Sequence, residues 1–370
     1  MHPRLIAYYL PQYHPIPEND KWWGKGFTEW TNVTKAKPLY RGHHQPHYPA
    51  DLGYYDLRVP EVREAQAQMA KRYGIEGFMY YHYWFGDGKK LLERPYQDML
   101  HAKSPDLPFC LCWANESWKG VWFGEFTGQM LIEQTYPGTK DIEAHFYYLL
   151  EAFKDDRYIK VDGKPLFNVY MPLNLPDAKA FAAQFNALAI KEGLPGLYLV
   201  GSRVPFDWNP HEYGFDAVIG SEMAQIRYRN QSKFKRPRYA IKRTQQIIEK
   251  ITGKEIFSPF NRPAVVEYAA IIDQLITTQT FDFDYYPCVI PNWDNTPRAG
   301  NGGLVFQNST PALFEKHLLK GIEKVQHLPP QRQLVFVKSW NEWAEGNYLE
   351  PDRTHGYAYL ESVKRVLDSL

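Results

Sequence analysis

Two glutamates three residues apart, Glu342 and Glu345, are the residues of this chain best suited to acid–base chemistry. Trp340 and Trp343 flank them, and the apolar run Leu334–Val337 just before the cluster predicts a buried strand that leads into it. If the turn after that strand is helical, the two carboxylates project from one face, a few ångströms apart. Glutamates at this spacing usually lie on a solvated helix face, but such faces rarely begin with Trp-Asn-Glu-Trp directly after a buried strand. The pattern therefore favours a catalytic carboxylate pair acting on a sugar.

Composition narrows the possible partners of such a pair. The net charge of +1 argues against a dedicated nucleic-acid binder, which would be strongly basic. The chain holds 27 Tyr, 21 Phe and 11 Trp, more Tyr and Trp than packing alone requires, although an aromatic-rich core would account for part of them. Because the apolar faces of sugars stack on such rings, an oligosaccharide or polysaccharide substrate is the expected partner.

The first residues and the cysteines bear on location. The segment Met1–Tyr9 lacks the long apolar stretch of a signal peptide, and no run of about 18 apolar residues exists that could span a membrane. Cys110, Cys112 and Cys288 form no complete disulfide set, and the first two are expected to be buried in a strand. We expect a cytoplasmic protein with no membrane span, although a trimmed secreted chain would look the same.

The elements that must position the glutamates follow a regular alternation. Eight short apolar runs predict strands: Leu5–Leu10, Gly77–Tyr83, Phe109–Ala114, Leu166–Met171, Leu197–Gly201, Ala217–Ser221, Tyr286–Pro291 and Leu334–Ser339. Amphipathic patterns predict helices at Val59–Tyr73, Lys140–Phe153, Pro176–Glu192, Pro263–Thr277, Pro311–Val325 and Tyr357–Leu370, with Thr139 and Thr310 as N-caps. This order predicts an α/β fold, a single (β/α)₈ TIM-like barrel over residues 1–370.

Two long insertions interrupt the alternation, one after strand one (about 12–56) and one after strand six (about 223–257). The first is rich in Trp, His, Pro and Tyr. The second is basic, with Arg227, Arg229, Lys233, Lys235, Arg236, Arg238, Lys242 and Arg243. The basic insertion is expected either to bind an anionic substrate or phosphate-bearing carrier, or to be a solvated surface hairpin.

Barrel enzymes place their chemistry at the C-terminal ends of the strands. Polar and aromatic side chains gather there in at least five of the predicted strands, which predicts a carbohydrate cleft. The predicted substrate-binding residues are Tyr9, Gln12, Glu29, Trp30, His82, Tyr83, Trp84, Trp113, Asn115, Glu116, Tyr170, Glu222, Asn292, Trp293, Trp340, Asn341 and Trp343. Among these, Glu116 is expected to bind a hydroxyl, and His82 to be either a hydroxyl partner or a core histidine.

The sequence gives no reason to expect a metal or another cofactor. His43, His44 and His47 lack acidic or Cys partners at ligand spacing. The Asp-x-Asp pattern in Phe281–Asp284 resembles the metal-binding motif of nucleotide-sugar transferases, but it precedes strand seven and is expected at the opposite rim, in a structural role.

Five segments carry a family likeness: Trp22–Val33, Gln45-Pro46, Asp51–Gly53, Trp113–Glu116 and Trp340–Glu345. They resemble the WbsX-like family of bacterial polysaccharide loci, which is in turn similar to glycoside hydrolase family 99, the endo-α-mannosidases and endo-α-mannanases. The first likeness covers nearly the whole chain. The second covers the barrel and the Asn-Glu-Trp-x-Glu element, and these hydrolases usually carry a bulkier polar residue where this chain has Ala344.

The resemblance to the hydrolases implies a retaining mechanism through a 1,2-anhydro sugar. In that pattern Glu345 is the general acid/base, whose pKa the neighbouring tryptophans would raise, and Glu342 takes the proton from the sugar 2-hydroxyl. The expected activity is endo-cleavage of an α-linked, mannose-like or related bacterial glycan. A glycosyltransferase of lipopolysaccharide O-antigen or capsule synthesis is the alternative, although no Gly-rich phosphate loop follows strand one. A catalytically silent sugar-binding protein is the third possibility.

Overall fold

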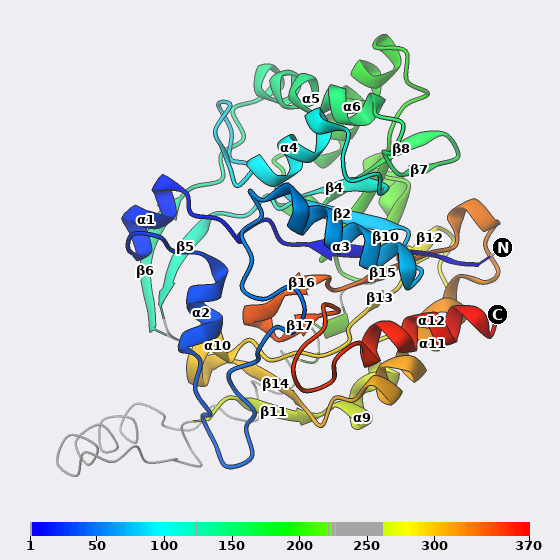
Figure 1. The fold of residues 1–370 in the computed structure, drawn as a ribbon. Coiled ribbons are helices and arrows are strands. Elements are labelled where there is room, and N and C mark those ends of the chain that lie inside the picture. The colour runs from blue at the N-terminus through cyan, green and yellow to red at the C-terminus, as the bar shows by residue number, and fades with distance from the viewer. Residues whose placement is uncertain (1, 123–124, 221, 224–225, 227–261) are drawn as a thin grey trace.

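The computed structural model describes residues 2–122, 125–220, 222–223, 226 and 262–370. Within them, strands at eight positions run parallel around a nearly closed, TIM-like barrel (Figure 1). In the order of the sheet these are β1 (Arg4–Tyr9), β2 (Gly77–Trp84), β4 (Phe109–Trp113), β8 (Lys164–Val169), β9 (Tyr198–Ser202), β10 (Ala217–Ile219), β12 (Asp284–Tyr286) with β13 (Cys288–Val289), and β15 (Leu334–Val337). The predicted fold class is confirmed, and the ends of each predicted strand differ by at most two residues.

The seventh strand closes the barrel in two pieces. Pro287 separates β12 from β13, and proline has no amide hydrogen to donate to a neighbouring strand. β12 pairs with β10, starting at Ala217 opposite Asp284, whereas β13 pairs with β15, with Cys288 opposite Phe336. The two halves of one strand therefore join the two sides of the sheet.

Helices cover the outside of the barrel. They are α3 (Pro60–Arg72), α4 (Arg94–Ala102), α5 (Thr139–Lys154), α6 (Ala178–Lys191), α11 (Pro311–Val325) and α12 (Ala358–Asp368). The Thr310 hydroxyl accepts a hydrogen bond from the Leu313 amide and caps α11 as predicted. The predicted cap at Thr139 is wrong, because Gly138 occupies the cap position and Thr139 is the first helical residue.

The predicted helix Pro263–Thr277 is also wrong in its first half. Residues Ala264–Glu267 form β11, which pairs in parallel with β14 (Leu304–Gln307), and only the short α9 (Tyr268–Ile271) and a 3₁₀ turn follow. Val265 and Val266 are β-branched, and pairing with a second strand outweighs the helical spacing of the apolar residues.

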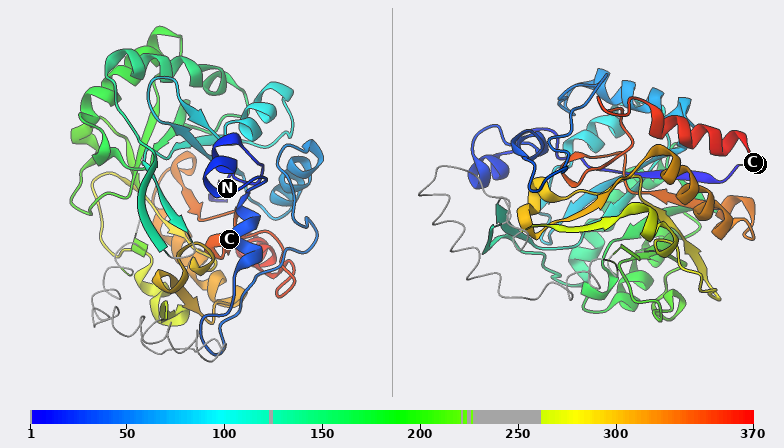
Figure 2. Two further views of the ribbon diagram at one scale, coloured as in Figure 1. Left: turned by 90° about the vertical axis from the view of Figure 1, so that its left-hand side faces the viewer. Right: turned by 90° about the horizontal axis from the view of Figure 1, so that it is seen from below.

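Additional elements gather at the rim toward which the barrel strands run, on the left-hand side of Figure 1 and facing the viewer in the left panel of Figure 2. The chain termini lie at the opposite end. The rim elements are α1 (Pro17–Trp23), α2 (Glu29–Lys35), the hairpin of β5 (Trp118–Trp122) and β6 (Glu125–Ile132), α10 (Thr296–Ala299), and the pair β16 (Asn341–Glu342) and β17 (Asn347–Tyr348). The hairpin was not predicted. The remaining short elements are β3 (Lys90–Leu91), β7 (Lys160–Val161), η1 (Pro172–Asn174), η2 (Pro210–Tyr213), η3 (Ile272–Gln274), η4 (Gly300–Gly302) and η5 (Pro330–Arg332).

The first insertion thus contributes α1 and α2 to the rim. The basic residues predicted in the second insertion, between 227 and 243, lie outside the described residues. Among the described helices, none has the length and apolar character needed to cross a membrane.

The segment that carries the two glutamates is fastened to the end of β1 by one buried side chain. The Leu10 amide donates to Asn341 Oδ1 at 2.7 Å, and Asn341 Nδ2 donates to the Leu10 carbonyl at 3.1 Å. The Asn341 side chain therefore pairs with the buried N–H and C=O of Leu10, which lie beyond the end of β1 and have no partner in the strand ladder.

We predict that Asn341→Ala lowers the free energy of unfolding by about 2–4 kcal/mol, because it leaves a buried donor and a buried acceptor unpaired. Urea denaturation checks this. Gln68→Ala is the control, since the Gln68 side chain bonds Glu64 on an exposed part of α3, and it should cost less than about 0.5 kcal/mol. Equal losses in the two variants would contradict the anchoring role.

Candidate active site

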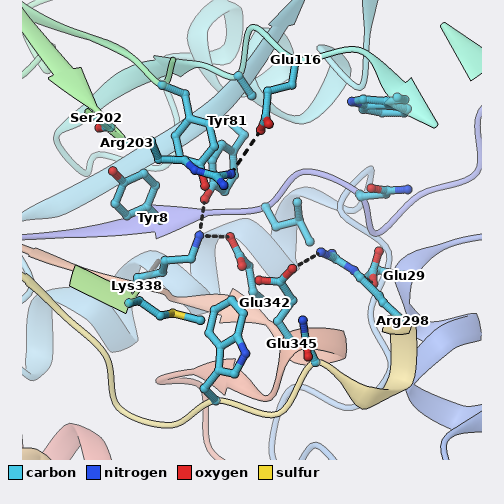
Figure 3. Close-up of a pocket in the computed structure, with 18 of the residues that line it drawn as sticks. Tyr8, Glu29, Tyr81, Glu116, Ser202, Arg203, Arg298, Lys338, Glu342 and Glu345 are labelled. Carbon is cyan, nitrogen blue, oxygen red and sulfur yellow. Dashed lines mark hydrogen bonds and ion pairs between the residues drawn. The ribbon is translucent and has the colours of Figure 1, made fainter. Parts of the chain in front are cut away.

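A cavity of about 800 Å³ opens at the C-terminal rim of the barrel, within the size range of ligand pockets (Figure 3). Nine of the nineteen predicted site residues line it: Gln12, Glu29, Tyr83, Glu116, Tyr170, Glu222, Trp293, Glu342 and Glu345. Residues that were not predicted line it too, chiefly Tyr8, Trp23, Tyr81, Trp118, Ser202, Arg203, Arg298 and Lys338. The cavity thus brings together acidic, basic and aromatic side chains from all eight strand ends.

The glutamate pair sits on a tight turn. Glu342 ends β16, and the 3₁₀ turn η6 (Trp343–Glu345) follows directly, so the turn is helical but narrower than an α-helix. Gly346 ends it with φ +58°, and a Cβ there would lie 2.8 Å from the Asp294 backbone nitrogen. That close approach lets the Asp294 amide donate to the Glu345 carbonyl at 2.7 Å. The turn is therefore tied to the end of strand seven.

The two carboxyl groups share a hydrogen bond, and their neighbours give them different charges. Burial raises the pKa of Glu342 and the charge of Glu345 adds to this, although the Lys338 ammonium 3.8 Å away opposes it. Burial alone would raise the pKa of Glu345 too. The Arg298 guanidinium, 2.8 Å from Oε1, acts together with Lys338 and the hydrogen bond from Glu342 to outweigh burial and lower this pKa, contrary to the raised pKa expected for Glu345. Glu342 therefore carries the proton and donates the hydrogen bond, and Glu345 is the ionised acceptor.

Arg298 joins Glu345 to a third carboxylate. Its Nε lies 2.7 Å from Oε1 of Glu29, a residue that is almost fully buried at the start of α2. Burial lowers the pKa of Arg298, but the charges of the two glutamates raise it more, so the guanidinium stays charged. One arginine from the helix after strand seven thus connects the first insertion with the glutamate turn.

Lys338 occupies the floor of the cavity at the end of β15. Its ammonium donates to the Tyr81 hydroxyl at 3.1 Å and lies 5.6–5.9 Å from the ring centroids of Tyr8, Tyr81, Tyr170 and Trp293. Burial lowers the pKa of Lys338, but the acidic groups around it, Glu342, Tyr170 and Glu345 among them, together raise it more, so the ammonium stays protonated. It can therefore stabilise negative charge on Glu342 or on a bound molecule.

Two more carboxyl groups line the cavity. Glu116 lies 3.7 Å from Nη1 of Arg203, and about two fifths of each side chain is exposed. Glu222 is buried, which raises its pKa, and it accepts hydrogen bonds from the Tyr285 hydroxyl and from the Thr277 amide at 3.2 Å. Both groups can accept hydrogen bonds from sugar hydroxyls.

Other predicted site residues point away from the cavity because side chains alternate along a strand. Tyr9 faces α3, where its hydroxyl donates to Gln66 at 2.7 Å. His82 faces α5 and contacts His145 at 2.8 Å between the two Nε2 atoms, and burial lowers its pKa to about 3. His82 is therefore a neutral core histidine. Their neighbours Tyr8, Tyr81 and Tyr83 take the inward positions.

Trp84, Trp113, Asn115 and Asn292 also have structural partners. The Trp84 and Trp113 indoles donate to Asp141 Oδ2 at 3.1 Å and to the Trp84 carbonyl at 2.9 Å. The Asn115 amide bonds both the amide and the carbonyl of Met171 at 2.8 Å. Asn292 Oδ1 accepts from the amide of Trp293. None of the four lines the cavity.

Trp30, Trp340, Asn341 and Trp343 pack behind the glutamate turn instead of lining the cavity. The Trp343 indole donates at 2.6 Å to Glu350, which also accepts from Tyr55 at 2.8 Å and Gln66 at 2.6 Å. Burial raises the pKa of Glu350 to about 7, although the hydrogen bonds from these donors lower it. This buried carboxyl holds the turn from behind.

Two motifs for which no catalytic role was predicted, the histidines of the first insertion and the Asp-x-Asp pattern, also have structural partners. His43 contacts Asp294 at 2.7 Å, which Gln45 also bonds, and the described residues contain no cluster of three or more His, Cys, Asp or Glu that could hold a metal ion. Asp284 of the Asp-x-Asp pattern starts β12 at the opposite rim, where it accepts from Tyr198 at 2.8 Å and pairs with Arg332.

Comparisons with known proteins identify relatives of this chain. A family model described as "Glycosyltransferase WbsX" matches residues 5–363. Two proteins named "Uncharacterized protein WxcX", from two strains of Xanthomonas campestris pv. campestris, are each 36% identical over 368 residues, which are 98% of this chain and 49% of theirs. The chain therefore spans about half the length of the curated relatives it matches.

Solved structures share the fold. The GH99 endo-alpha-mannosidase from Bacteroides thetaiotaomicron, in complex with BIS-TRIS-propane, superposes with a TM-score of 0.57 at 14% identity over 99% of this chain and 97% of its own. A "Glycoside hydrolase-like protein" superposes with a TM-score of 0.58, also at 14% identity, over 99% and 94%. At this identity the likeness concerns the fold alone.

The raised pKa of Glu350 makes stability depend on pH. Folded Glu350 holds its proton up to about pH 7, whereas an unfolded Glu loses it near pH 4.3. The stability that this proton contributes is therefore complete below the unfolded pKa and is lost as the pH rises through the folded pKa.

We predict that the free energy of unfolding of the wild-type chain falls more steeply between about pH 5 and pH 8 than that of Glu350→Gln, which cannot titrate. Urea denaturation at several pH values measures both slopes. Glu361→Gln, an exposed position on α12, should keep the wild-type slope. Identical slopes for wild type and Glu350→Gln would contradict the elevated pKa.

Proposed function

The chain belongs to the WbsX family, and from this premise we propose that it is a retaining glycoside hydrolase that cleaves within an α-linked bacterial polysaccharide of mannose-like or related sugars. The observation that carries the proposal is the pair of adjoining carboxyl groups at the C-terminal rim of the barrel, Glu342 buried and Glu345 partly buried, with Lys338 and Arg298 beside them. Aromatic rings on the cavity walls, such as Tyr83, Trp118 and Trp293, offer stacking surfaces for sugar rings.

The reaction begins with a proton shift along the existing hydrogen bond. In the free enzyme Glu342 is protonated and Glu345 is the carboxylate held by Arg298. When substrate enters, we expect the proton to pass from Glu342 to Glu345, because Lys338 can stabilise the carboxylate that forms on Glu342. The pair is then a protonated Glu345, an acid, beside an ionised Glu342, a base.

The first chemical step uses both groups. Glu342 removes the proton of the sugar 2-hydroxyl, whose oxygen forms a bond to the anomeric carbon. The bond from that carbon to the leaving oxygen breaks, and Glu345 gives this oxygen its proton. In the second step Glu345 takes a proton from a water that attacks the anomeric carbon. The bond to O2 breaks, and Glu342 returns its proton to that oxygen.

The arrangement of the pair supports this route over direct attack by a carboxylate. An ordinary retaining enzyme holds its two carboxyl groups about 5–5.5 Å apart, on opposite sides of the bond to be broken. Glu342 and Glu345 instead contact each other on one tight turn and reach the cavity from the same side. Such a pair is suited to moving protons at neighbouring oxygens of one sugar.

A glycosyltransferase of O-antigen or capsule synthesis is the second candidate, and the description of the matching family model favours it. Two features count against a nucleotide-dependent transferase in this chain. The segment after β1 reads Leu-Pro-Gln-Tyr-His instead of a Gly-rich phosphate loop, and the Asp-x-Asp pattern lies at the rim away from the cavity.

Mass spectrometry separates the two candidates. The chain is incubated with bacterial capsule or O-antigen glycans, with and without sugar nucleotides. We expect shorter glycans to be released without any nucleotide. Product formation that strictly requires a sugar nucleotide would establish the transferase instead.

We predict that Glu345→Gln and Glu342→Gln each reduce the rate of cleavage by about 10²–10⁴-fold, the usual contribution of a general acid or base. Glu361→Gln on α12 serves as the control and should keep full activity. Glycosyl fluorides then separate the roles, because fluoride needs no protonation to leave. They should restore the first step in Glu345→Gln but not in Glu342→Gln. Full activity in either glutamine variant on the natural glycan would contradict the assignment.

Participation of the sugar itself gives a further prediction. Substrates whose 2-hydroxyl is replaced by hydrogen or methoxyl should bind but release no product, because no oxygen nucleophile can form at C2. Competition binding and product analysis measure both properties. Normal turnover of the methoxyl substrate would rule out the 1,2-anhydro route and require another nucleophile.

A further inference from the structure

The floor of the cavity holds a cation whose hydrogen-bonding capacity is only partly used. An ammonium has three donors, and among the described residues the Tyr81 hydroxyl is the one acceptor within hydrogen-bond distance of Lys338, at 3.1 Å. The nearest carboxyl oxygen of Glu342 is 3.8 Å away, beyond a hydrogen bond. Lys338 therefore faces the cavity with donors left for a bound molecule.

A second cation, Arg203, reaches the same part of the cavity from the end of β9. Its backbone is in the left-handed region, with φ +52°, which is uncommon and unfavourable for a residue with a side chain. Its guanidinium lies over the Tyr170 ring, 5.4 Å from the centroid, and bonds the Tyr170 hydroxyl, whereas Glu116 is 3.7 Å away, beyond hydrogen-bond distance. The fold therefore holds Arg203 in an unfavourable backbone conformation that places its guanidinium donors at the edge of the cavity.

The two cations converge. Both lie against the ring of Tyr170, Arg203 at 5.4 Å and Lys338 at 5.8 Å from its centroid, and Figure 3 shows both pointing into the same part of the pocket near Tyr81. The hydroxyls of a neutral sugar can be bound by uncharged donors and by carboxylates, which this cavity also contains. Two cations with unused donors indicate that the ligand brings a negative charge.

We propose that Arg203 and Lys338 form a recognition site for the carboxylate of an acidic sugar, so that the polysaccharide unit bound in this cavity is a uronic acid. The proposal rests on the proposed function and names its class of substrate. The planar guanidinium suits a carboxylate, which it can bind through two parallel hydrogen bonds. A phosphate would bring more negative charge close to Glu116 and Glu342, which lie 3.7 and 3.8 Å from the two cations, and is therefore disfavoured.

Calorimetric binding tests the proposal without requiring turnover. The ligands are the methyl α-glycosides of glucuronic, galacturonic and mannuronic acid, their neutral counterparts glucose, galactose and mannose, and the corresponding sugar 1-phosphates. At least one uronide should bind at least about tenfold more tightly than its neutral counterpart, as expected for a charge-assisted bidentate contact. The preference should weaken with added salt.

Variants identify the residue responsible. Arg203→Gln should bring the uronide-to-neutral ratio close to one while leaving binding of the neutral glycoside within about threefold. Arg203→Gly is the second variant, since glycine suits the left-handed backbone and keeps the turn folded. Arg365→Gln on α12, where Arg365 pairs with Glu315 far from the cavity, is the matched control and should keep the wild-type ratio.

The proposal is overturned if uronides bind no better than neutral glycosides, if no uronide binds, or if the sugar 1-phosphates are preferred. It is also overturned if Arg203→Gln loses binding of both ligand classes equally. The last would make Arg203 a general hydroxyl ligand. Failure of the hydrolase proposal looks different, because a protein that cleaves nothing can still prefer uronides. Conversely, an active hydrolase with no preference for acidic sugars would remove only this inference.

Discussion

Two carboxyl groups in hydrogen-bond contact inside a protein cannot both be ionised at little cost, and this constraint organises the site. Glu342 and Glu345 meet it by sharing one proton. Arg298 pairs directly with Glu345 and favours its ionised form, whereas Lys338 stands farther from Glu342 and leaves it protonated. Burial and the distances of the two cations together set this difference, so a bound sugar that shifts either cation can reverse which glutamate is the acid and which is the base.

The surrounding structure keeps the glutamate turn from relaxing this contact. Asn341 ties it to the end of β1, the Asp294 amide ties it to the end of strand seven, and Glu350 holds it from behind through Trp343. These anchors belong to three separate parts of the chain. The tryptophans of the motif therefore act mainly as structural supports, and the sugar-facing aromatic rings come from other strands.

The fold and the glutamate pair could be predicted from the sequence because both depend on local patterns: alternating strand and helix periods, and two residues on one turn. The cavity wall was harder to predict. A strand end presents alternate residues to opposite sides, so Tyr8 and Tyr81 line the cavity whereas Tyr9 and His82 face helices. Lys338, Arg203 and Arg298 were missed because their roles depend on partners brought together only by the closed barrel. A strand pairing that lies 40 residues away in the chain, between β11 and β14, likewise overrode a helical pattern.

The most direct test of this account is a ¹³C NMR titration of the side-chain carboxyl groups of Glu342 and Glu345 in the wild type and in Arg298→Met. The account predicts that Glu342 titrates above an ordinary glutamate and Glu345 below it, and that losing the guanidinium raises the pKa of Glu345. If both groups titrate together in the ordinary range of about 4.3, or if Arg298→Met leaves Glu345 unchanged, the shared proton and the roles built on it are contradicted.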